Sequence, residues 1–159
     1  HCDNGIVVDD HCRTSDPDIY AAGDCTNHPN PLMNKRLRLE SVPNAMDQAR
    51  VSTANMLGDD KVYAAIPWFW SDQYDLKLQM VGFSADGDSQ VLRGDMDTHQ
   101  FAIFYLKDGK VVAADAVNSP KEFMLCKQLV GKPADPAKLA DPETDLKSLL
   151  AWLAEELKK

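Results

Sequence analysis

The sequence predicts an α+β fold in two parts, and three observations support this prediction. A helical segment from Pro43 to Gly58 is the clearest local signal in the chain. Short strand-like runs precede it, separated by polar turns. After it, strand-like segments follow one another and lead into helices, the order typical of an antiparallel sheet flanked by helices. We therefore expect a small first region and a larger α+β second region.

The first region contains short extended segments. Gly5–Asp9 is a β-branched run that favours a strand. Ile19–Asp24 is apolar and ends at a Gly-Asp pair, so it is either a buried strand or one helical turn, because periodicity does not separate the two. Asn27–Pro31 has the composition of a loop. Lys35–Leu39 alternates basic and apolar residues, the pattern of a strand with one solvated face.

The helix has signals at both ends. Pro43 stands in the first turn, Gly58 follows the last turn, and Ser41 is positioned to cap the N-terminus. Apolar residues recur at helical spacing, with Thr53 filling the intervening turn of the same face: Ala45, Met46, Ala49, Met56 and Leu57. The sequence thus predicts a helix with one apolar face.

The polar connector Asp59–Lys61 suggests a domain boundary, with domains at residues 1–58 and 62–159. Beyond an aromatic cluster, we expect a hairpin at Asp108–Gly109, because Asp-Gly favours a tight two-residue turn. A helix should end at Gly131, and residues 132–142 should form a loop. The expected strands are Leu76–Val81, Ser89–Arg93, Phe101–Leu106 and Val111–Val117, and Leu146–Leu157 is expected to be an amphipathic helix.

Composition excludes several classes of protein. The 159 residues are 44% hydrophobic, which is typical of a globular chain. Asp and Glu number 25 against 17 Lys and Arg, so a nucleic-acid-binding surface is not expected. The longest apolar runs are far shorter than the roughly 20 residues that cross a bilayer. The chain starts at His1 with no Met and no signal peptide, so we expect it to be a piece of a longer protein.

The four cysteines are scattered along the chain and form no CxxC pair, so neither a zinc site nor a redox dithiol is indicated. We expect ordinary reduced thiols and a cytoplasmic location, because nothing in the sequence signals secretion. The cysteines are Cys2, Cys12, Cys25 and Cys126.

The Gly23–Asp24 pair is the first candidate for ligand binding. An apolar strand ending in Gly-Asp would place a carboxylate at the carboxyl edge of a sheet, where open α/β sheets bind ligands. Gly23 permits close backbone approach, and Asp24 accepts hydrogen bonds from ribose or polyol hydroxyls. The alternative interpretation is a turn with a helix cap.

The longer string around this pair resembles a known motif. It is similar to the second flavin-binding motif of two-dinucleotide flavoprotein reductases, in which Thr is followed by Ile/Val, Tyr/Phe, Ala and Gly-Asp. The resemblance implies that Asp24 contacts the ribityl chain of FAD. The matching residues are Thr14, Ile19, Tyr20, Ala21, Gly23 and Asp24.

Other segments resemble NADH-dependent ferredoxin reductases of the putidaredoxin reductase-like family, within the pyridine nucleotide-disulfide oxidoreductase superfamily. These are the FAD enzymes that serve ring-hydroxylating dioxygenases and cytochrome P450 systems. The resemblance runs from about Gly5 to Leu150. It is carried by Arg38–Ala45 with Gln48–Ala49, Pro67–Asp75, Gln79–Gly82, Arg93–Gly94, Phe104–Leu106 and Ala113–Pro120 with Glu122–Phe123.

The resemblance implies a fold and a set of contacts. Residues 1–58 would be the last strands and helix of an α/β FAD-binding domain, and residues 62–159 the C-terminal reductase domain. The start of the helix near Pro43 would face the pyrimidine end of the flavin, where its dipole stabilises negative charge. The candidate cofactor-binding residues are Gly23, Asp24, Glu40, Ser41, Val42, Pro43, Asn44 and Trp70, with Trp68 as the alternative to Trp70.

Two assignments stay open at this point. Glu40 either orients the nicotinamide or pairs with Arg38 or Lys35. The basic residues Lys35, Arg36 and Arg38 either attract an acidic 2Fe–2S ferredoxin, with Trp68 as a further contact, or form a solvated strand edge.

The sequence contains no G-x-G-x-x-G fingerprint, whereas an enzyme of this family needs two. We therefore expect a fragment of a reductase that moves electrons from NADH or NADPH through FAD to a ferredoxin. The isolated chain should lack FAD and be inactive. The alternatives are a non-catalytic interaction or dimerisation module, with homo-oligomers formed through the exposed fragment surface, and a rubredoxin reductase fragment.

Overall fold

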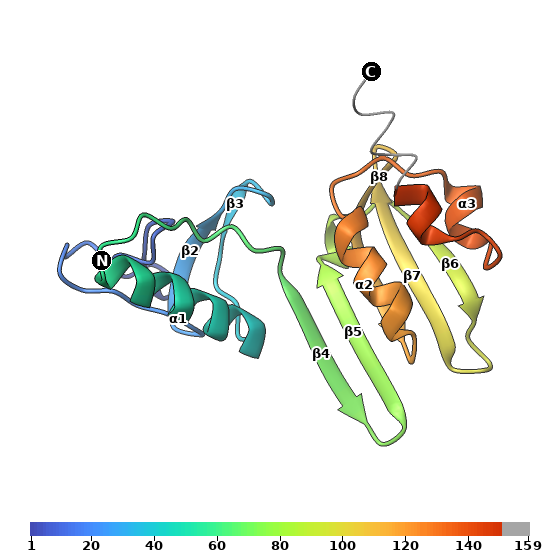
Figure 1. Ribbon diagram of the computed structural model, residues 1–159, viewed down its shortest axis with the longest axis horizontal. Helices are drawn as coiled ribbons and strands as arrows, with labels where there is room; N and C mark the ends of the chain where they lie inside the picture. Colours follow the sequence, from blue (N-terminus) through green and yellow to red (C-terminus); the bar gives the residue numbers. More distant parts are fainter. Residues whose placement is uncertain (151–159) are drawn as a thin grey trace. The chain divides into compact units, whose positions relative to one another are not determined.

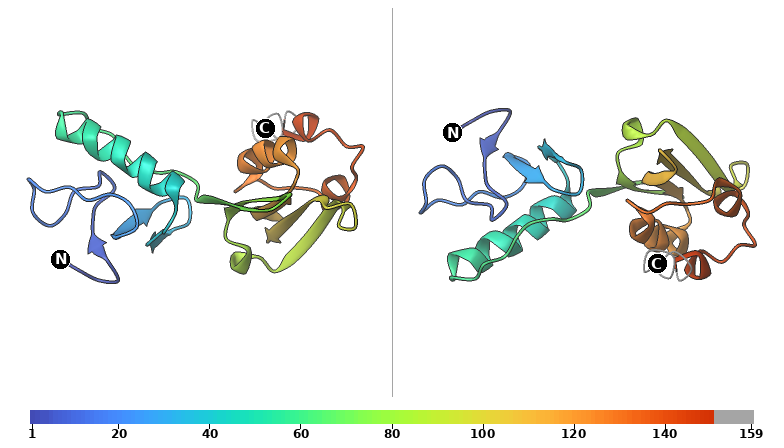
Figure 2. Two further views of the ribbon diagram at one scale, coloured as in Figure 1. Left: turned by 90° about the horizontal axis from the view of Figure 1, so that it is seen from below. Right: turned by 90° about the horizontal axis from the view of Figure 1, so that it is seen from above.

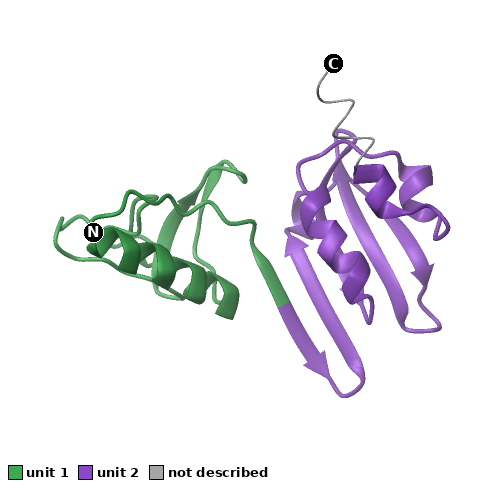
Figure 3. Ribbon diagram, in the orientation of Figure 1, with its two compact units in different colours: residues 1–69 green, residues 70–159 purple. Residues whose placement is uncertain are grey.

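The computed structural model describes residues 1–150 of the chain. These residues divide into two compact units, residues 1–69 and residues 70–150 (Figure 3). The α+β fold predicted from the sequence is confirmed, since a small mixed sheet with one long helix is followed by a five-stranded antiparallel sheet with helices. The connector expected at Asp59–Lys61 lies within the first unit.

The first unit contains a three-stranded sheet in the order β1-β2-β3 (Figure 1). Strand β1 (Ile6–Val7) runs parallel to β2 (Thr26–Asn30), with Ile6 opposite Thr26. Strand β3 (Lys35–Leu37) runs antiparallel to β2, with His28 opposite Leu37. The strands expected at Gly5–Asp9 and Lys35–Leu39 are therefore present in shortened form.

Two expectations for this region are wrong. The segment Thr26–Asn30, which overlaps the expected loop, is the central strand of the small sheet. Its polar side chains are buried and bonded across the unit: Asn30 Nδ2 donates to the Ala65 carbonyl at 3.0 Å. The run Ile19–Asp24 is neither a strand nor a helical turn, and Tyr20 makes only an isolated bridge with Arg13. Partners far away in sequence, and not local composition, determine the conformation of these segments.

Helix α1 (Val42–Met56) confirms the helix predicted between Pro43 and Gly58. Ser41 is its N-cap, and the Ser41 hydroxyl accepts a hydrogen bond from the Asn44 N–H at 3.3 Å. Proline in the first turn has no N–H to leave unpaired, which suits that position. The cap and the proline together explain why the helix begins where the sequence indicates.

Helix α1 buries its polar face and exposes its apolar face, the reverse of the usual arrangement. The buried residues within it are mainly polar: Pro43, Asn44, Gln48, Ser52 and Asn55. The predicted apolar face is largely exposed, and Met46, Met56 and Leu57 show 50%, 59% and 83% of their surface. Helix α1 thus joins its unit through hydrogen bonds and presents an apolar face to solvent.

The segment after α1 runs back along the helix within the first unit (Figures 1 and 2). Asn55 holds its start, accepting from the Lys61 N–H at 2.8 Å and donating to the Lys61 carbonyl at 2.9 Å. Tyr63 is buried, and its N–H donates to the Asp10 carbonyl at 2.7 Å. These bonds attach the segment to the first unit.

The larger sheet has the strand order β4-β5-β8-β7-β6 (Figure 1). Strands β7 and β8 form the hairpin predicted at Asp108–Gly109, where both residues have positive φ. The four strands predicted for this region are confirmed, and an edge strand, β4, is added by the aromatic segment. Their bounds are β4 Trp68–Gln73, β5 Leu76–Gly82, β6 Ser89–Asp95, β7 Gln100–Lys107 and β8 Lys110–Val117.

Helices α2 (Pro120–Leu129) and α3 (Pro136–Ala140) lie on one face of this sheet (Figures 1 and 2). A short 3₁₀ turn, η1 (Ser84–Asp86), joins β5 to β6. The helix predicted to end at Gly131 is α2, and α3 interrupts the loop expected at 132–142. Helical backbone resumes at Leu146, while the end of the predicted Leu146–Leu157 helix lies outside the described residues.

The core of the second unit lies between this face and α2. Phe104, Val111 and Ala114 of the sheet are fully buried, as are Phe123 and Leu129 of α2. Burial of these apolar side chains is the main driving force for folding of the unit. None of the helices within residues 1–150 has the length and apolar character needed to cross a membrane.

Candidate functional site

The Gly23–Asp24 pair forms a tight turn against α1. Gly23 is buried and has φ +89°, a conformation that side-chain-bearing residues rarely adopt. A Cβ atom at Gly23 would lie 3.5 Å from Cβ of Ala45 on the helix, so the turn and the helix are in close contact. The side chain of Asp24 is exposed, which leaves its carboxylate available to hydroxyl donors.

The position of this turn differs from the sequence expectation in one respect. Gly23–Asp24 precedes β2, which begins at Thr26, so the carboxylate lies at the amino end of a strand and not beyond its carboxyl end. The turn closes through the Thr26 N–H, which donates to the Gly23 carbonyl at 3.0 Å. The strand begins late because Gly23 has a positive φ and cannot continue an extended ladder.

Among the described residues, the first turn of α1 has one backbone donor without an acceptor, the Val42 N–H. The Asn44 N–H donates to the Ser41 hydroxyl, the Ala45 N–H donates to the Ser41 carbonyl at 3.0 Å, and Pro43 has no N–H. Among the described residues, the Val42 N–H has no such acceptor. A helix N-terminus carries partial positive charge, so Val42 offers a hydrogen-bond donor suited to an oxygen with negative charge.

Asn44 lies at the start of α1, where a ligand contact was expected, but its side chain has a structural role. Its side chain is 3% exposed, and both polar ends are bonded inside the unit. Nδ2 donates to the Leu39 carbonyl at 3.1 Å, and Oδ1 accepts from the Tyr63 hydroxyl at 3.0 Å. The Asn44 side chain therefore braces the helix start and is not presented to a ligand.

The basic residues near the site are engaged within the first unit. Arg38 Nη1 pairs with Glu40 Oε1 at 2.5 Å and donates to the Asp24 carbonyl at 3.4 Å. Of the roles left open for Glu40, pairing with Arg38 is the one seen in this structure. Arg36 donates to the Val8 carbonyl at 2.7 Å and to Asn27 Oδ1 at 2.9 Å, so its guanidinium supports the strands.

The two tryptophans fall in different units, although both belong to β4. Trp68 lines a small crevice at the start of α1, together with Ser41, Pro43 and Tyr63. Trp70 is 44% exposed on the second unit. Trp68, the alternative flavin contact, is therefore the tryptophan that lies beside the start of α1 within one unit.

The buried polar residues behind the site were not predicted to be site residues, although Gln48 belongs to a segment that resembles the family. Gln48, Tyr63 and His28 are all almost completely buried in the first unit. The ring of His28 meets that of Tyr63 edge to face, with 5.1 Å between centroids. Burial raises the pKa of Tyr63 to about 12. A signal existed in the sequence, because Asn44, Gln48, Ser52 and Asn55 recur at helical spacing.

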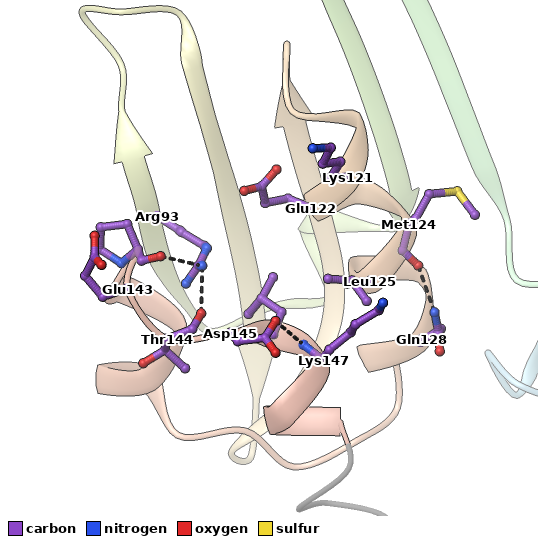
Figure 4. Close-up of a pocket in the computed structure, with 12 residues that line it drawn as sticks. Arg93, Lys121, Glu122, Met124, Leu125, Gln128, Glu143, Thr144, Asp145 and Lys147 are labelled. Carbon is purple, nitrogen blue, oxygen red and sulfur yellow. Dashed lines mark hydrogen bonds between the residues drawn. The ribbon is translucent and has the colours of Figure 1, made fainter.

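A pocket of about 710 Å³ lies in the second unit beside α2 (Figure 4). The guanidinium of Arg93 reaches its wall but is occupied by backbone carbonyls. Nη2 donates to Pro142 and Thr144 at 3.0 and 2.9 Å, and Nη1 donates to Asp141 and Leu139. Because both Nη atoms are already used, and Nε is buried with no partner among the described residues, Arg93 fastens the loop after α3 and is not presented to a ligand.

The reductase C-terminal family model matches residues 68–150, more than half of the chain, and the pyridine nucleotide-disulphide oxidoreductase model matches residues 1–49. The chain therefore belongs to the reductase C-terminal family. It is 48% identical over 151 residues to the 5,5'-dehydrodivanillate O-demethylase ferredoxin reductase subunit of Sphingobium sp., with 93% of this chain aligned. It is 43% identical over 157 residues to putidaredoxin reductase of Pseudomonas putida, with 98% aligned.

Solved structures agree with the sequence relatives. The covalent putidaredoxin reductase–putidaredoxin complex matches 97% of the chain with a TM-score of 0.90 at 42% identity. The ferredoxin reductase for the CYP199A2 system of Rhodopseudomonas palustris matches 92% with a TM-score of 0.86 at 40% identity. In each of these matches, the chain spans 37% of the length of the related chain. The resemblance to ferredoxin reductases is thus confirmed.

Proposed function

We propose that this chain is part of an FAD-dependent NAD(P)H:ferredoxin oxidoreductase whose 2Fe–2S ferredoxin serves an oxygenase. The observation that carries the proposal is that the same unit contains an exposed carboxylate, at Asp24, and a backbone donor at the start of α1, the Val42 N–H. Relatives over nearly the whole chain are named as ferredoxin reductases. Four free thiols suit a reducing compartment, and we propose a cytoplasmic location.

The residues present fit a flavin dinucleotide. Asp24 would accept hydrogen bonds from ribityl hydroxyls, and Gly23 allows the chain to turn closely beneath them. The Val42 N–H, with Ser41 and Pro43 shaping the helix start, would face the pyrimidine end of the ring. The Asn44 side chain holds this start in place through Leu39 and Tyr63.

FAD, when bound, supplies hydride acceptance and one-electron transfer. The contribution of this chain is to bind and orient. A fixed N–H at a helix start stabilises negative charge that develops on a nearby oxygen, without reorganisation when the charge appears. We retain Glu40 as a residue near the nicotinamide, held by Arg38, and Trp70, with Trp68 as the alternative, as an aromatic contact of the flavin.

For the ferredoxin partner, we propose that positive charge at Lys35, Arg36 and Arg38, with Trp68, attracts an acidic surface. Arg36 and Arg38 are bonded within the unit, but their charges still contribute to the surface potential. NADH is the proposed electron donor. For the isolated chain, the proposal is a folded but non-catalytic module that forms homo-oligomers through its exposed surface, and a rubredoxin reductase remains the alternative parent.

A chimera tests the proposed function. This chain replaces the matched 37% of putidaredoxin reductase of Pseudomonas putida. We expect the purified chimera to be yellow and to bleach with NADH, whereas the isolated chain stays colourless after incubation with FAD. A folded chimera, by circular dichroism, that takes up no flavin would contradict the proposal.

A matched pair of variants tests whether the Asp24 carboxylate contacts FAD. Asp24→Ala in the chimera should weaken FAD binding about tenfold, the effect of about 1.4 kcal/mol at one hydrogen-bonded contact. Asp18→Ala removes another exposed carboxylate from the same loop and should leave affinity unchanged. Equal FAD affinities for the two variants would remove Asp24 from the site.

A further inference from the structure

Gln48 is a polar side chain buried completely in the first unit, with none of its surface exposed. It stands on α1, one turn beyond Asn44. Glutamine is seldom fully buried unless its amide is bonded. Its contacts therefore show what the residue contributes.

The amide oxygen of Gln48 holds the Gly23–Thr26 turn. Oε1 accepts from the Gly23 N–H at 2.7 Å and from the Thr26 hydroxyl at 2.8 Å. Gly23 and Gln48 are 25 residues apart in sequence, so this is a tertiary bond between the turn and the helix. The same hydroxyl lies 2.8 Å from the Gly23 carbonyl, so its single proton is shared between this oxygen and Oε1.

The amide nitrogen of Gln48 has no equivalent partner. Nε2 is buried and has no acceptor among the described residues. A buried donor without a partner is costly. An apolar side chain of similar length would avoid this cost but would leave the Gly23 N–H without its acceptor. The oxygen is therefore the part of Gln48 that the structure uses.

We infer that Gln48 is a positioning residue, which fixes the Asp24 carboxylate relative to the N-terminus of α1. The inference rests on the proposed function, in which Asp24 meets the ribityl chain and the helix start meets the pyrimidine end of FAD. These two contacts fall on adjoining parts of one ligand, the ribityl chain and the ring that carries it, so the separation of the two protein groups must be held. The bond from Gly23, the neighbour of Asp24, to Gln48 holds it.

The first test uses the isolated chain and amide hydrogen exchange measured by NMR. Gln48→Met keeps the length of the side chain and removes the acceptor. Exchange at the Gly23 amide should rise at least tenfold, while amides later in α1, such as that of Ser52, keep their protection. Gln128→Met makes the same change on an exposed helical position of the second unit and should leave Gly23 unchanged. Undiminished protection of Gly23 in Gln48→Met would overturn the inference.

Gln48→Glu has a side chain of the same shape as glutamine and should restore the acceptor that Gln48→Met removes. The carboxyl group keeps an acceptor oxygen for Gly23 in either protonation state, but burial of the carboxylate charge destabilises the unit, which raises the pKa of the group. Protection of Gly23 should therefore be close to that of the parent chain at low pH and should fall as pH rises. A pH-independent loss in Gln48→Glu, equal to that in Gln48→Met, would count against a role for the oxygen.

The second test is a double-mutant cycle for FAD affinity in the chimera. Gln48→Met alone should weaken binding about tenfold, as Asp24→Ala does, and the double variant should be little weaker than either. Such non-additivity arises when one residue acts through the other. Additive losses would overturn positioning. A chimera that binds no FAD refutes the proposed function, whereas the exchange result at Gly23 tests the bond itself.

Discussion

The Tyr63 hydroxyl donates a hydrogen bond to Oδ1 of Asn44 at 3.0 Å in the interior of the first unit. Asn44 donates in turn to the Leu39 carbonyl, which precedes the helix cap. The segment after α1 therefore braces the start of α1. The helix end proposed to face the flavin is held by a residue that follows the helix in sequence.

Tyr63→Phe should destabilise the first unit by about 1–3 kcal/mol, because it leaves Oδ1 of Asn44 buried without a donor. Urea unfolding followed by circular dichroism measures the loss. Tyr74→Phe is the control, since Tyr74 is fully exposed at a turn and its change should stay within about 0.5 kcal/mol. Equal stabilities for the two variants would contradict this role for the hydroxyl.

The first unit should lose stability in mild acid because of His28. Burial, and then the positive charge of Arg36, lower the pKa of His28 from 6.5 to about 4. The unfolded chain binds the proton more readily between these values. The stabilisation is therefore complete above pH 6.5 and is lost as pH falls toward 4.

His28→Phe keeps the ring contact with Tyr63 and removes the titrating group. The free energy of unfolding, measured with urea at several pH values, should therefore fall less steeply in acid than that of the parent chain. His11 provides the control, because its hydrogen bond to Asp10 raises its pKa, and its protonation acts in the opposite direction. In His11→Asn, the acid loss should persist. A profile of His28→Phe identical to that of the parent chain would contradict the assignment.

Gly23→Ala should cost about 1–2 kcal/mol, chiefly through its positive φ, because the nearest atom to the added Cβ is at an ordinary contact distance. Gly109→Ala has comparable backbone strain with open space around it. Both variants should lose similar stability by thermal unfolding. Only Gly23→Ala should also weaken FAD binding in the chimera, and an equal effect of both on FAD would contradict a local role for Gly23.

Arg93→Met should destabilise the second unit by at least about 2 kcal/mol, because four backbone carbonyls lose a charged donor. Limited proteolysis should then cut near residues 139–144, and thermal unfolding measures the loss. Arg50→Met removes an arginine that pairs with Asp47 on an exposed helix face, and should have an effect below about 0.5 kcal/mol. Unchanged protease resistance in Arg93→Met would show that the loop is held by other contacts.

The elements that the sequence predicted well are those governed by local rules. Ser41 and Pro43 specify the start of α1 within a few residues, and Asp108–Gly109 specifies a hairpin turn through backbone conformation alone. The candidate residues Asp24 and Val42 came from motif resemblance, and the structure adds that both residues are exposed.

The features that escaped prediction depend on partners far away in sequence. Thr26–Asn30 has a poor strand composition, and it is extended because β1, β3 and Ala65 bond to it. Gln48 looked like an ordinary helix residue, because its acceptor function exists only once Gly23 reaches it. Local composition carries no information about such long-range bonds.

The outward apolar face of α1 has a consequence for mutational tolerance. In a scan of all substitutions, stability of the isolated chain should depend more on Gln48, Ser52 and Asn55 than on Met46 or Met56, the reverse of what hydropathy would rank. In the chimera, substitutions of Met46 and Met56 should become destabilising where the rest of the reductase covers these side chains. The positions that change between the two scans would trace, residue by residue, the surface through which this chain joins its enzyme.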